Sequence, residues 1–198
     1  MHIAKTLITL ALFLSTPVVT IAQTHTDSHT DFHSYHKLIE RRPLLAHVRL
    51  CLEHPSHCET HRDTRNELHP DALLREMRAI NLRVNRTIRP MPDPEGQDIW
   101  TLHAREGDCE DYALQKQHEL LLAGWPSSAL RIAVVRGEHV EELHAVLLVR
   151  IGNTDWVLDN LTNAVRPWQD TPYEFLFVQS RDNPQDWKDV ILASSLSS

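Results

Sequence analysis

Cys109 is the residue of this chain best placed to act as a nucleophile. It stands in the segment GDCEDYA, residues 107–113, at the start of a helical pattern that stops at Gly124. With Asp108 as the N-cap, the thiol would lie in the first helical turn. There the positive end of the helix dipole and free backbone N–H groups favour a thiolate and could hold an oxyanion. A cysteine packed in the core is the alternative interpretation.

A predicted hairpin supplies a base and an acid for that nucleophile. Two apolar, β-branched runs are joined through Gly152-Asn153, which is a hairpin signature. If the turn holds an even number of residues, His144 and Asp159 lie on one face of neighbouring strands within side-chain reach. A thiol, an imidazole and a carboxylate then provide a nucleophile, its base and a group that orients the base. The pattern leaves open a structural His144 and a turn-forming Asp159.

Three acids surround the predicted nucleophile. Asp108, Glu110 and Asp111 place negative charge beside a group that must become a thiolate, and like charges raise the pKa of a thiol. A bound divalent cation would relieve this repulsion and would prefer such oxygen ligands. An N-cap with two acids that complement the helix dipole is the alternative.

The other two cysteines are expected to form a disulfide if the chain is exported. Cys51 and Cys58 are seven residues apart, close enough to close a small loop, and an exported chain is expected to pair them. A metal site with the interleaved His54, His57 and His61 is the alternative, although the spacing fits no standard zinc pattern.

The order of the helices and strands expected to position these residues predicts an α+β domain. Helices are expected over residues 38–52 with an interruption at Pro43, over a segment that opens at Pro70, and over 108–123. The helix from Pro70 has one apolar stripe, formed by Leu73, Met77, Ile80 and Val84. The expected strands are Leu130–Val135, Leu143–Ile151, Trp156–Leu158 and Tyr173–Val178.

The first segment predicts an export signal. Residues 1–22 carry Lys5, an apolar run and small residues before a cleavage site near Gln23, and an uncleaved anchor is the alternative. Residues 23–36, QTHTDSHTDFHSYH, predict a flexible polar leader, and residues 37–198 a single domain. The leader histidines could bind a transition metal on one helical face, but Thr, Asp and Ser make that helix poor.

Composition excludes several classes of protein. The hydrophobic share of 41% and charged share of 24% are those of a globular chain and argue against disorder. The net charge of -7 argues against non-specific binding to nucleic acid or to anionic membranes. The five glycines form no phosphate-binding loop, so nucleotide chemistry is not expected.

The strings GDCEDYA (107–113), ELHAVLL (142–148) and WVLDNL (156–161) resemble the bacterial transglutaminase-like cysteine proteinases, and within them the periplasmic LapG type. The resemblance implies a papain-like or transglutaminase-like α+β core. It also implies a triad of Cys109 as nucleophile, His144 as base and Asp159 as the orienting acid. The chain departs from the family pattern after Trp100, where Thr101-Leu102 stands in place of Thr-Pro, and its first 65 residues match little.

The resemblance further implies calcium, held at Asp108, Glu110 and Asp111, and a protein substrate. That substrate would be the N-terminal region of a large surface adhesin, cut beside small residues and thereby released from the cell surface. An inner-membrane receptor that sequesters the protease is a further partner that the family suggests. The same triad supports acyl transfer to an amine, the first alternative activity. The second alternative is a calcium-responsive periplasmic binding module without turnover.

Overall fold

A seven-stranded antiparallel sheet with the strand order β1-β9-β8-β4-β5-β6-β7 forms the centre of the molecule. The computed structural model describes residues 31–64, 69–137 and 143–192. The strands of the sheet are β1 (His36–Arg41), β4 (Leu130–Gly137), β5 (His144–Ile151), β6 (Thr154–Leu158), β7 (Arg166–Pro167), β8 (Tyr173–Gln179) and β9 (Trp187–Leu192). A separate parallel pair consists of β2 (Arg89–Pro90) and β3 (Glu106–Gly107).

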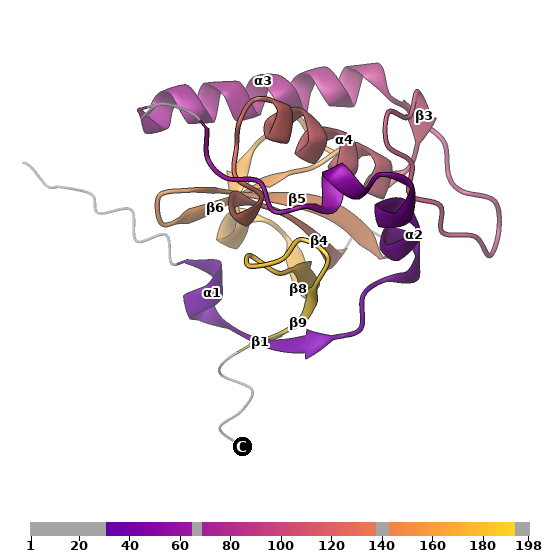
Figure 1. The fold of residues 1–198 in the computed structure, drawn as a ribbon. Helices are drawn as coiled ribbons and strands as arrows, with labels where there is room; N and C mark the ends of the chain where they lie inside the picture. Colours follow the sequence, from indigo (N-terminus) through magenta and orange to yellow (C-terminus); the bar gives the residue numbers. More distant parts are fainter. Residues whose placement is uncertain (1–30, 65–68, 138–142, 193–198) are drawn as a thin grey trace, which may run out of the picture.

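Helices cover both faces of this sheet (Figure 1). The α-helices are α1 (Phe32–Tyr35), α2 (Leu45–Glu53), α3 (Pro70–Thr87) and α4 (Cys109–Leu122). Helices α2, α3 and α4 share one core with β4, β5 and β6, which includes Met77, Leu114 and Leu147. On the other face, Phe32 of α1 and Trp168 of the 3-10 helix η3 (Trp168–Asp170) share a second core with Val146 and Phe175. The predicted α+β fold is confirmed.

The elements with strong local signals lie where they are predicted. Helix α3 opens at Pro70 and buries Met77, Ile80 and Val84 of the expected apolar stripe. The β5–β6 hairpin turns through two residues, with Ile151 paired to Thr154. Its first turn residue, Gly152, has a φ of 58°, a left-handed conformation that favours glycine. The even-numbered turn on which the His144–Asp159 argument depends is therefore present.

Two predictions about the N-terminal part are wrong. Residues 38–41, expected to be helical, belong to strand β1, because they pair antiparallel with β9. The end of the predicted flexible leader is folded: residues 32–35 form α1, and Phe32 is fully buried. The predicted export signal and the leader up to residue 30 lie outside the described residues. In the part of the chain that the structure describes, no helix has the length and apolar character that crossing a membrane requires.

A buried ionic network explains why the end of the leader is ordered. Asp155 of β6 is fully buried, and its Oδ1 accepts a hydrogen bond of 2.6 Å from Arg131 and one of 3.1 Å from Arg150. The other carboxylate oxygen accepts from the backbone N–H of Phe32 at 3.2 Å. Arg150 also forms an ion pair with Asp31. The sheet thus binds the first turn of α1 through charged hydrogen bonds, which are stronger than neutral ones.

Asp155→Asn should therefore destabilise the fold by about 3 kcal/mol or more, because it removes a buried negative charge that pairs with the buried Arg131. Asp189→Asn is the matched control. It breaks a partly exposed pair with Arg41 and should cost at most about 1 kcal/mol. Urea unfolding of both variants and the parent measures the difference. Equal losses in the two variants would contradict the proposed role of Asp155.

Candidate active site

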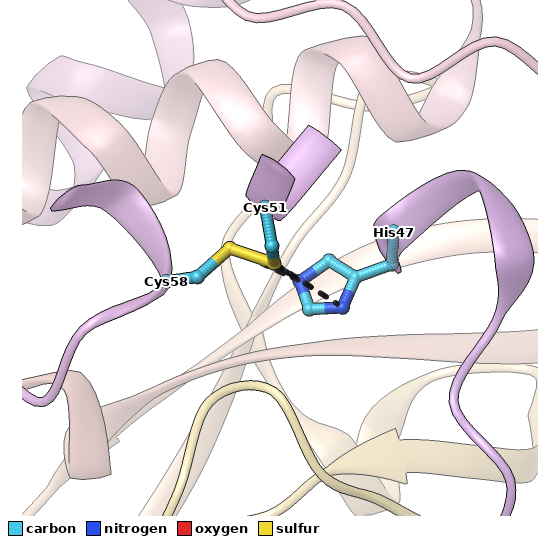
Figure 2. Close-up of side chains that lie close together, drawn as sticks. All are labelled: His47, Cys51 and Cys58. Atoms are coloured by element: carbon cyan, nitrogen blue, oxygen red, sulfur yellow. Dashed lines mark hydrogen bonds between the residues drawn. A yellow bond between two sulfur atoms is a disulfide. The ribbon is translucent and has the colours of Figure 1, made fainter. Parts of the chain in front are cut away.

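A disulfide leaves Cys109 as the one free cysteine of the three in the chain. Cys51 at the end of α2 is bonded to Cys58 of the 3-10 helix η1 (Pro55–Cys58), with a Cα–Cα distance of 5.6 Å. His47 lies beside this bond, with its Nε2 3.6 Å from Cys51 Sγ (Figure 2). Because both sulfurs are bonded, they cannot act as thiolate metal ligands, so the disulfide prediction is confirmed over the metal alternative.

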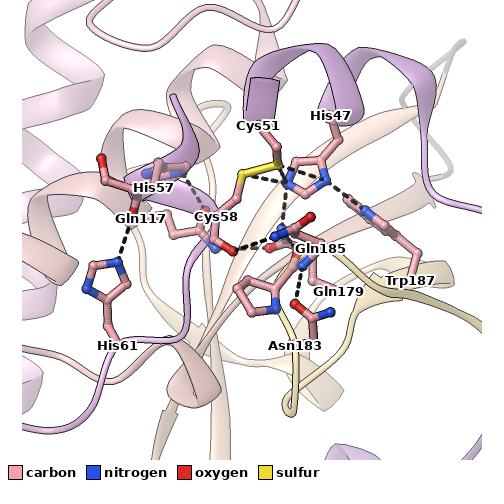
Figure 3. The surroundings of a disulfide bond; sticks show 12 residues. His47, Cys51, His57, Cys58, His61, Gln117, Gln179, Asn183, Gln185 and Trp187 are labelled. Atoms are coloured by element: carbon pink, nitrogen blue, oxygen red, sulfur yellow. Dashed lines mark hydrogen bonds between the residues drawn. A yellow bond between two sulfur atoms is a disulfide. The ribbon is translucent and has the colours of Figure 1, made fainter. Parts of the chain in front are cut away.

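Side chains from strand β9 and from the turn before it contact this disulfide segment (Figure 3). Trp187 Nε1 donates a hydrogen bond of 3.1 Å to His47 Nδ1. Gln185 Nε2 donates to the carbonyl oxygen of Cys58. The covalent loop is thereby attached to β9 and to the turn before it.

Cys109 is the first residue of helix α4, with Asp108 as the N-cap. Helix α4 packs against β5, and the backbone N–H of Ala145 donates a hydrogen bond of 3.3 Å to Cys109 Sγ. The hydroxyl of Tyr112, on the next turn of α4, donates a hydrogen bond of 2.7 Å to the carbonyl oxygen of Ile88. This bond attaches the helix to the end of α3. The thiol therefore lies at a helix start, as predicted, and next to the strand that begins with His144.

His144 and Asp159 form a buried pair, with 2.9 Å between Nε2 and Oδ1. The two side chains are 4% and 3% exposed. Asp159 also accepts a hydrogen bond of 2.5 Å from the Tyr173 hydroxyl and one of 3.0 Å from the Leu161 amide. Burial would raise the pKa of Asp159, but the hydrogen bonds from His144 and Tyr173 outweigh it and the net shift is downward. Since an ionised carboxylate only accepts, His144 Nε2 carries the proton and Nδ1 is left to act as a base.

Two residues that hold Asp159 were not predicted from the sequence. Tyr173 was assigned only to a strand, although its hydroxyl contacts the carboxylate. Asn85 Nδ2 of α3 donates a hydrogen bond of 2.9 Å to the backbone oxygen of Asp159 and one of 3.2 Å to the backbone oxygen of Thr162. No spacing in the sequence indicates either contact, because each joins segments that are distant along the chain.

Cys109 and His144 line one open cavity of about 550 Å³. The loop of residues 92–98 and Trp100 line the same cavity. Leu143, which is half-exposed, lies at the same cavity. A segment of extended peptide could therefore reach the thiol and the imidazole from solvent.

The acids at this cavity form a group that only partly matches the predicted one. Carboxylate oxygens of Asp93, Asp98 and Glu110 lie within 4.8 Å of one another. Asp108 adjoins them, since its Oδ2 accepts from the Asp93 amide at 3.4 Å. The predicted ligand Asp111 is not in this group, and its Oδ1 accepts a hydrogen bond of 2.7 Å from the Thr101 amide. Asp93 and Asp98 come from the loop, which the sequence analysis does not connect to the acidic helix start.

These residues fit a hard divalent cation such as calcium. Asp108 Oδ1 is buried and has no hydrogen-bond partner among the residues that the structure describes. All the ligand atoms that these residues offer are carboxylate oxygens, the type that calcium prefers. Burial raises the pKa of Glu110, as does the adjacent Asp108, so the group is electrostatically unfavourable without a positive charge.

The same acids act on the thiol. Burial and the charge of Glu110 raise the pKa of Cys109 far above its ordinary value, and the hydrogen bond from Ala145 offsets only part of this shift. In this arrangement the thiol donates a hydrogen bond of 3.1 Å to Glu110 Oε2. The protonated thiol is therefore the resting form when no cation neutralises the acids.

Comparison with known proteins identifies the family. Residues 38–194 match the family described as bacterial transglutaminase-like cysteine proteinase BTLCP. The structure of calcium-bound LapG from Legionella pneumophila aligns with 62% of this chain and 70% of that one, at 21% identity and a TM-score of 0.52. EGTA-treated LapG from the same organism aligns with 63% and 69%, at 21% identity and a TM-score of 0.50. At this identity the alignments show a shared fold. No curated protein sequence matches significantly.

Thiol titration of the unfolded, unreduced chain should find one free thiol, because Cys51 and Cys58 are bonded and Cys109 is not. Cys109→Ala is the control and should leave no free thiol. Non-reducing peptide mapping should recover the segments with Cys51 and Cys58 as one linked pair. A linked pair that contains Cys109 would contradict the assignment.

Proposed function

The chain belongs to the bacterial transglutaminase-like cysteine proteinases, and from this premise we propose that Cys109, His144 and Asp159 are the catalytic triad of a calcium-dependent endopeptidase. The observation that carries the proposal is the buried His144–Asp159 pair at the cavity that also contains Cys109. The chain is a cysteine protease of transglutaminase-like fold, and the triad and the calcium requirement are the proposed additions.

The arrangement supports a two-step acyl-enzyme mechanism. His144 Nδ1 takes the proton of Cys109 Sγ, and the sulfur attacks the carbonyl carbon of the peptide bond. Backbone N–H groups at the start of α4 stabilise the oxyanion. His144 then gives its proton to the leaving amine, and a water molecule hydrolyses the thioester with His144 as base. Asp159 keeps the imidazole in the Nε2–H form throughout.

Calcium would be held by Asp93, Asp98 and Glu110, with Asp108 beside them. When bound, it offsets the negative charge next to the thiol and so lowers the pKa of Cys109. The existence of calcium-bound and EGTA-treated forms of the LapG neighbour supports this assignment. Asp111 would then stabilise the loop through Thr101 rather than bind the ion.

The proposed substrate is a large surface adhesin, cut near its N-terminus between small residues and released from the cell. The proposed compartment is the periplasm, which the disulfide supports because such bonds persist in oxidising compartments. An inner-membrane receptor that sequesters the protease remains a proposed partner. Incubation with N-terminal regions of adhesins from the same organism tests the substrate. Two cleavage fragments support a protease, whereas isopeptide-linked products would indicate acyl transfer.

Cys109→Ala and His144→Ala should abolish cleavage while leaving the fold intact, because they remove the nucleophile and the base. Tyr173→Phe should lower kcat about tenfold with little change in KM, since a hydrogen bond to a charged acceptor contributes about 1.5 kcal/mol. Tyr35→Phe, which removes a hydroxyl outside the Asp159 network, is the matched control. Steady-state kinetics with circular dichroism as a fold check measures these effects. Measurable cleavage by Cys109→Ala would show that the proposed triad is wrong.

Removal of calcium should stop cleavage, and its return should restore activity, because the acids then regain their counter-charge. Asp93→Asn and Asp98→Asn should each weaken calcium binding about tenfold or more, whereas Glu95→Gln in the same loop should not. Calorimetric titration of EGTA-treated protein measures the affinity. Full activity in EGTA, together with no calcium binding at about 1 mM, would contradict this assignment.

A further inference from the structure

Three histidines gather beside the C-terminal half of helix α4, outside the cavity that contains Cys109. His118 belongs to α4, His57 to η1, and His103 to the loop before β3. The ring centroids of His103 and His118 are 4.6 Å apart, and those of His57 and His118 are 5.8 Å apart. The proposed protease mechanism uses none of them, so the group has no explanation in that function.

Hydrogen bonds around Gln117 determine the protonation of His57. Gln117 Nε2 donates to the Leu130 carbonyl oxygen at 3.2 Å and to Gln179 Oε1 at 2.9 Å. Gln179 Oε1 also accepts from the Ile132 amide at 2.7 Å, which establishes the orientation of both amides. Gln117 Oε1 is therefore an acceptor, and His57 Nε2, 3.0 Å away, must donate to it (Figure 3). The lone pair of a neutral His57 is on Nδ1.

This lone pair is buried and unused among the described residues. The His57 side chain is 6% exposed, and its Nδ1 has no hydrogen-bond partner there. Burial lowers the pKa of His57 to about 4, with a further contribution from His118, so the ring is neutral at neutral pH. A buried acceptor without a partner costs about 1–3 kcal/mol, a cost that a ligand would remove. A histidine that donates its other N–H to an oxygen acceptor is the usual arrangement of a metal ligand.

The two other rings are free to adjust while their backbone is held. His118 is half-buried and His103 is exposed, so both side chains can rotate. His103 has a φ of 64°, a left-handed conformation that is uncommon for a residue other than glycine. Its backbone N–H donates a hydrogen bond of 3.2 Å to Gln115 Oε1 of α4. The loop is thereby held with His103 next to His118.

We propose that His57, His103 and His118 form a binding site for a divalent transition-metal ion of the zinc class, with His57 Nδ1 as the buried ligand. Imidazole nitrogens suit zinc, copper and nickel, whereas calcium requires oxygen ligands. Metal–nitrogen distances of about 2.0 Å in a tetrahedral site place neighbouring ring centroids about 5 Å apart, between the two separations observed here. As the side chains stand, the nitrogens of all three rings do not lie within 4.8 Å of one another, so the proposal requires the two outer rings to rotate toward the ion. The fourth position is open to water or to His54, whose charge acts on both His57 and His118.

The test uses the untagged full chain with Cys109→Ala in calcium-containing buffer. This background removes the free thiol and occupies the acidic group, two other places where zinc could bind. Calorimetric titration with zinc chloride should give one ion at micromolar or tighter affinity, and zinc should raise the melting temperature. His103→Asn and His118→Asn should each weaken zinc binding at least about tenfold. The double variant His25→Asn/His29→Asn controls for zinc on the leader and should retain the affinity.

Cobalt substitution gives a second readout that does not depend on stability. Cobalt bound to the parent should show the visible absorption of a tetrahedral nitrogen-ligated ion, and His118→Asn should lose it. Three results would overturn the proposal: no zinc binding at about 100 µM, unchanged affinity in both single variants, or loss of binding in the leader control. His57 is left intact in all variants because its burial makes a change there a test of folding.

Discussion

The hydrogen bond from the Ala145 amide to Cys109 Sγ joins the two elements on which the candidate site depends, helix α4 and strand β5. His144 directly precedes Ala145, so this contact also keeps the backbone of His144 near the sulfur. The hairpin register then places Asp159, because Leu147 pairs with Leu158 across the two-residue turn. A shift of one residue would move the Asp159 side chain to the other face of the sheet and leave His144 without its acceptor. The site therefore requires the contact between α4 and β5 and the register of the β5–β6 hairpin. The core that packs between these elements maintains both.

Local signals were sufficient to predict the elements that carry the site. The apolar stripe of α3, the acidic start of α4 and the Gly152 turn each act over a few residues, and the structure has them at the predicted places. Strand β1 and helix α1 could not be predicted in this way. Their order comes from pairing with β9 and from Asp155, which lies more than a hundred residues further along the chain. The local sequence predicted a polar leader at α1 and a helix at β1. Charge pairing with Asp155 overrode the first prediction, and backbone pairing with β9 overrode the second.

In the candidate site, too, the local sequence predicts some residues and only the tertiary structure reveals the others. Residue type and spacing indicated Cys109, His144 and Asp159, and the structure brings the latter two into contact. Tyr173 and Asn85, which hold Asp159, belong to a strand and a helix whose positions only the tertiary structure reveals. Asp93 and Asp98 belong to an irregular loop that folds over the start of α4. Charge repulsion predicts a cation beside the thiol, but it does not indicate which distant acids would complete its shell.

Helix α4 is also held by hydrogen bonds that lie outside the cavity. Gln117 bonds to His57, to the Leu130 carbonyl oxygen and to Gln179, so one side chain connects the helix with η1, β4 and β8. The Cys51–Cys58 bond limits the freedom of η1 and hence of His57. A buried amide whose partners are all fixed cannot shift without losing several hydrogen bonds at once. The helix that carries Cys109 is therefore anchored at Gln117 by an amide network, and that network contacts a segment that contains the disulfide.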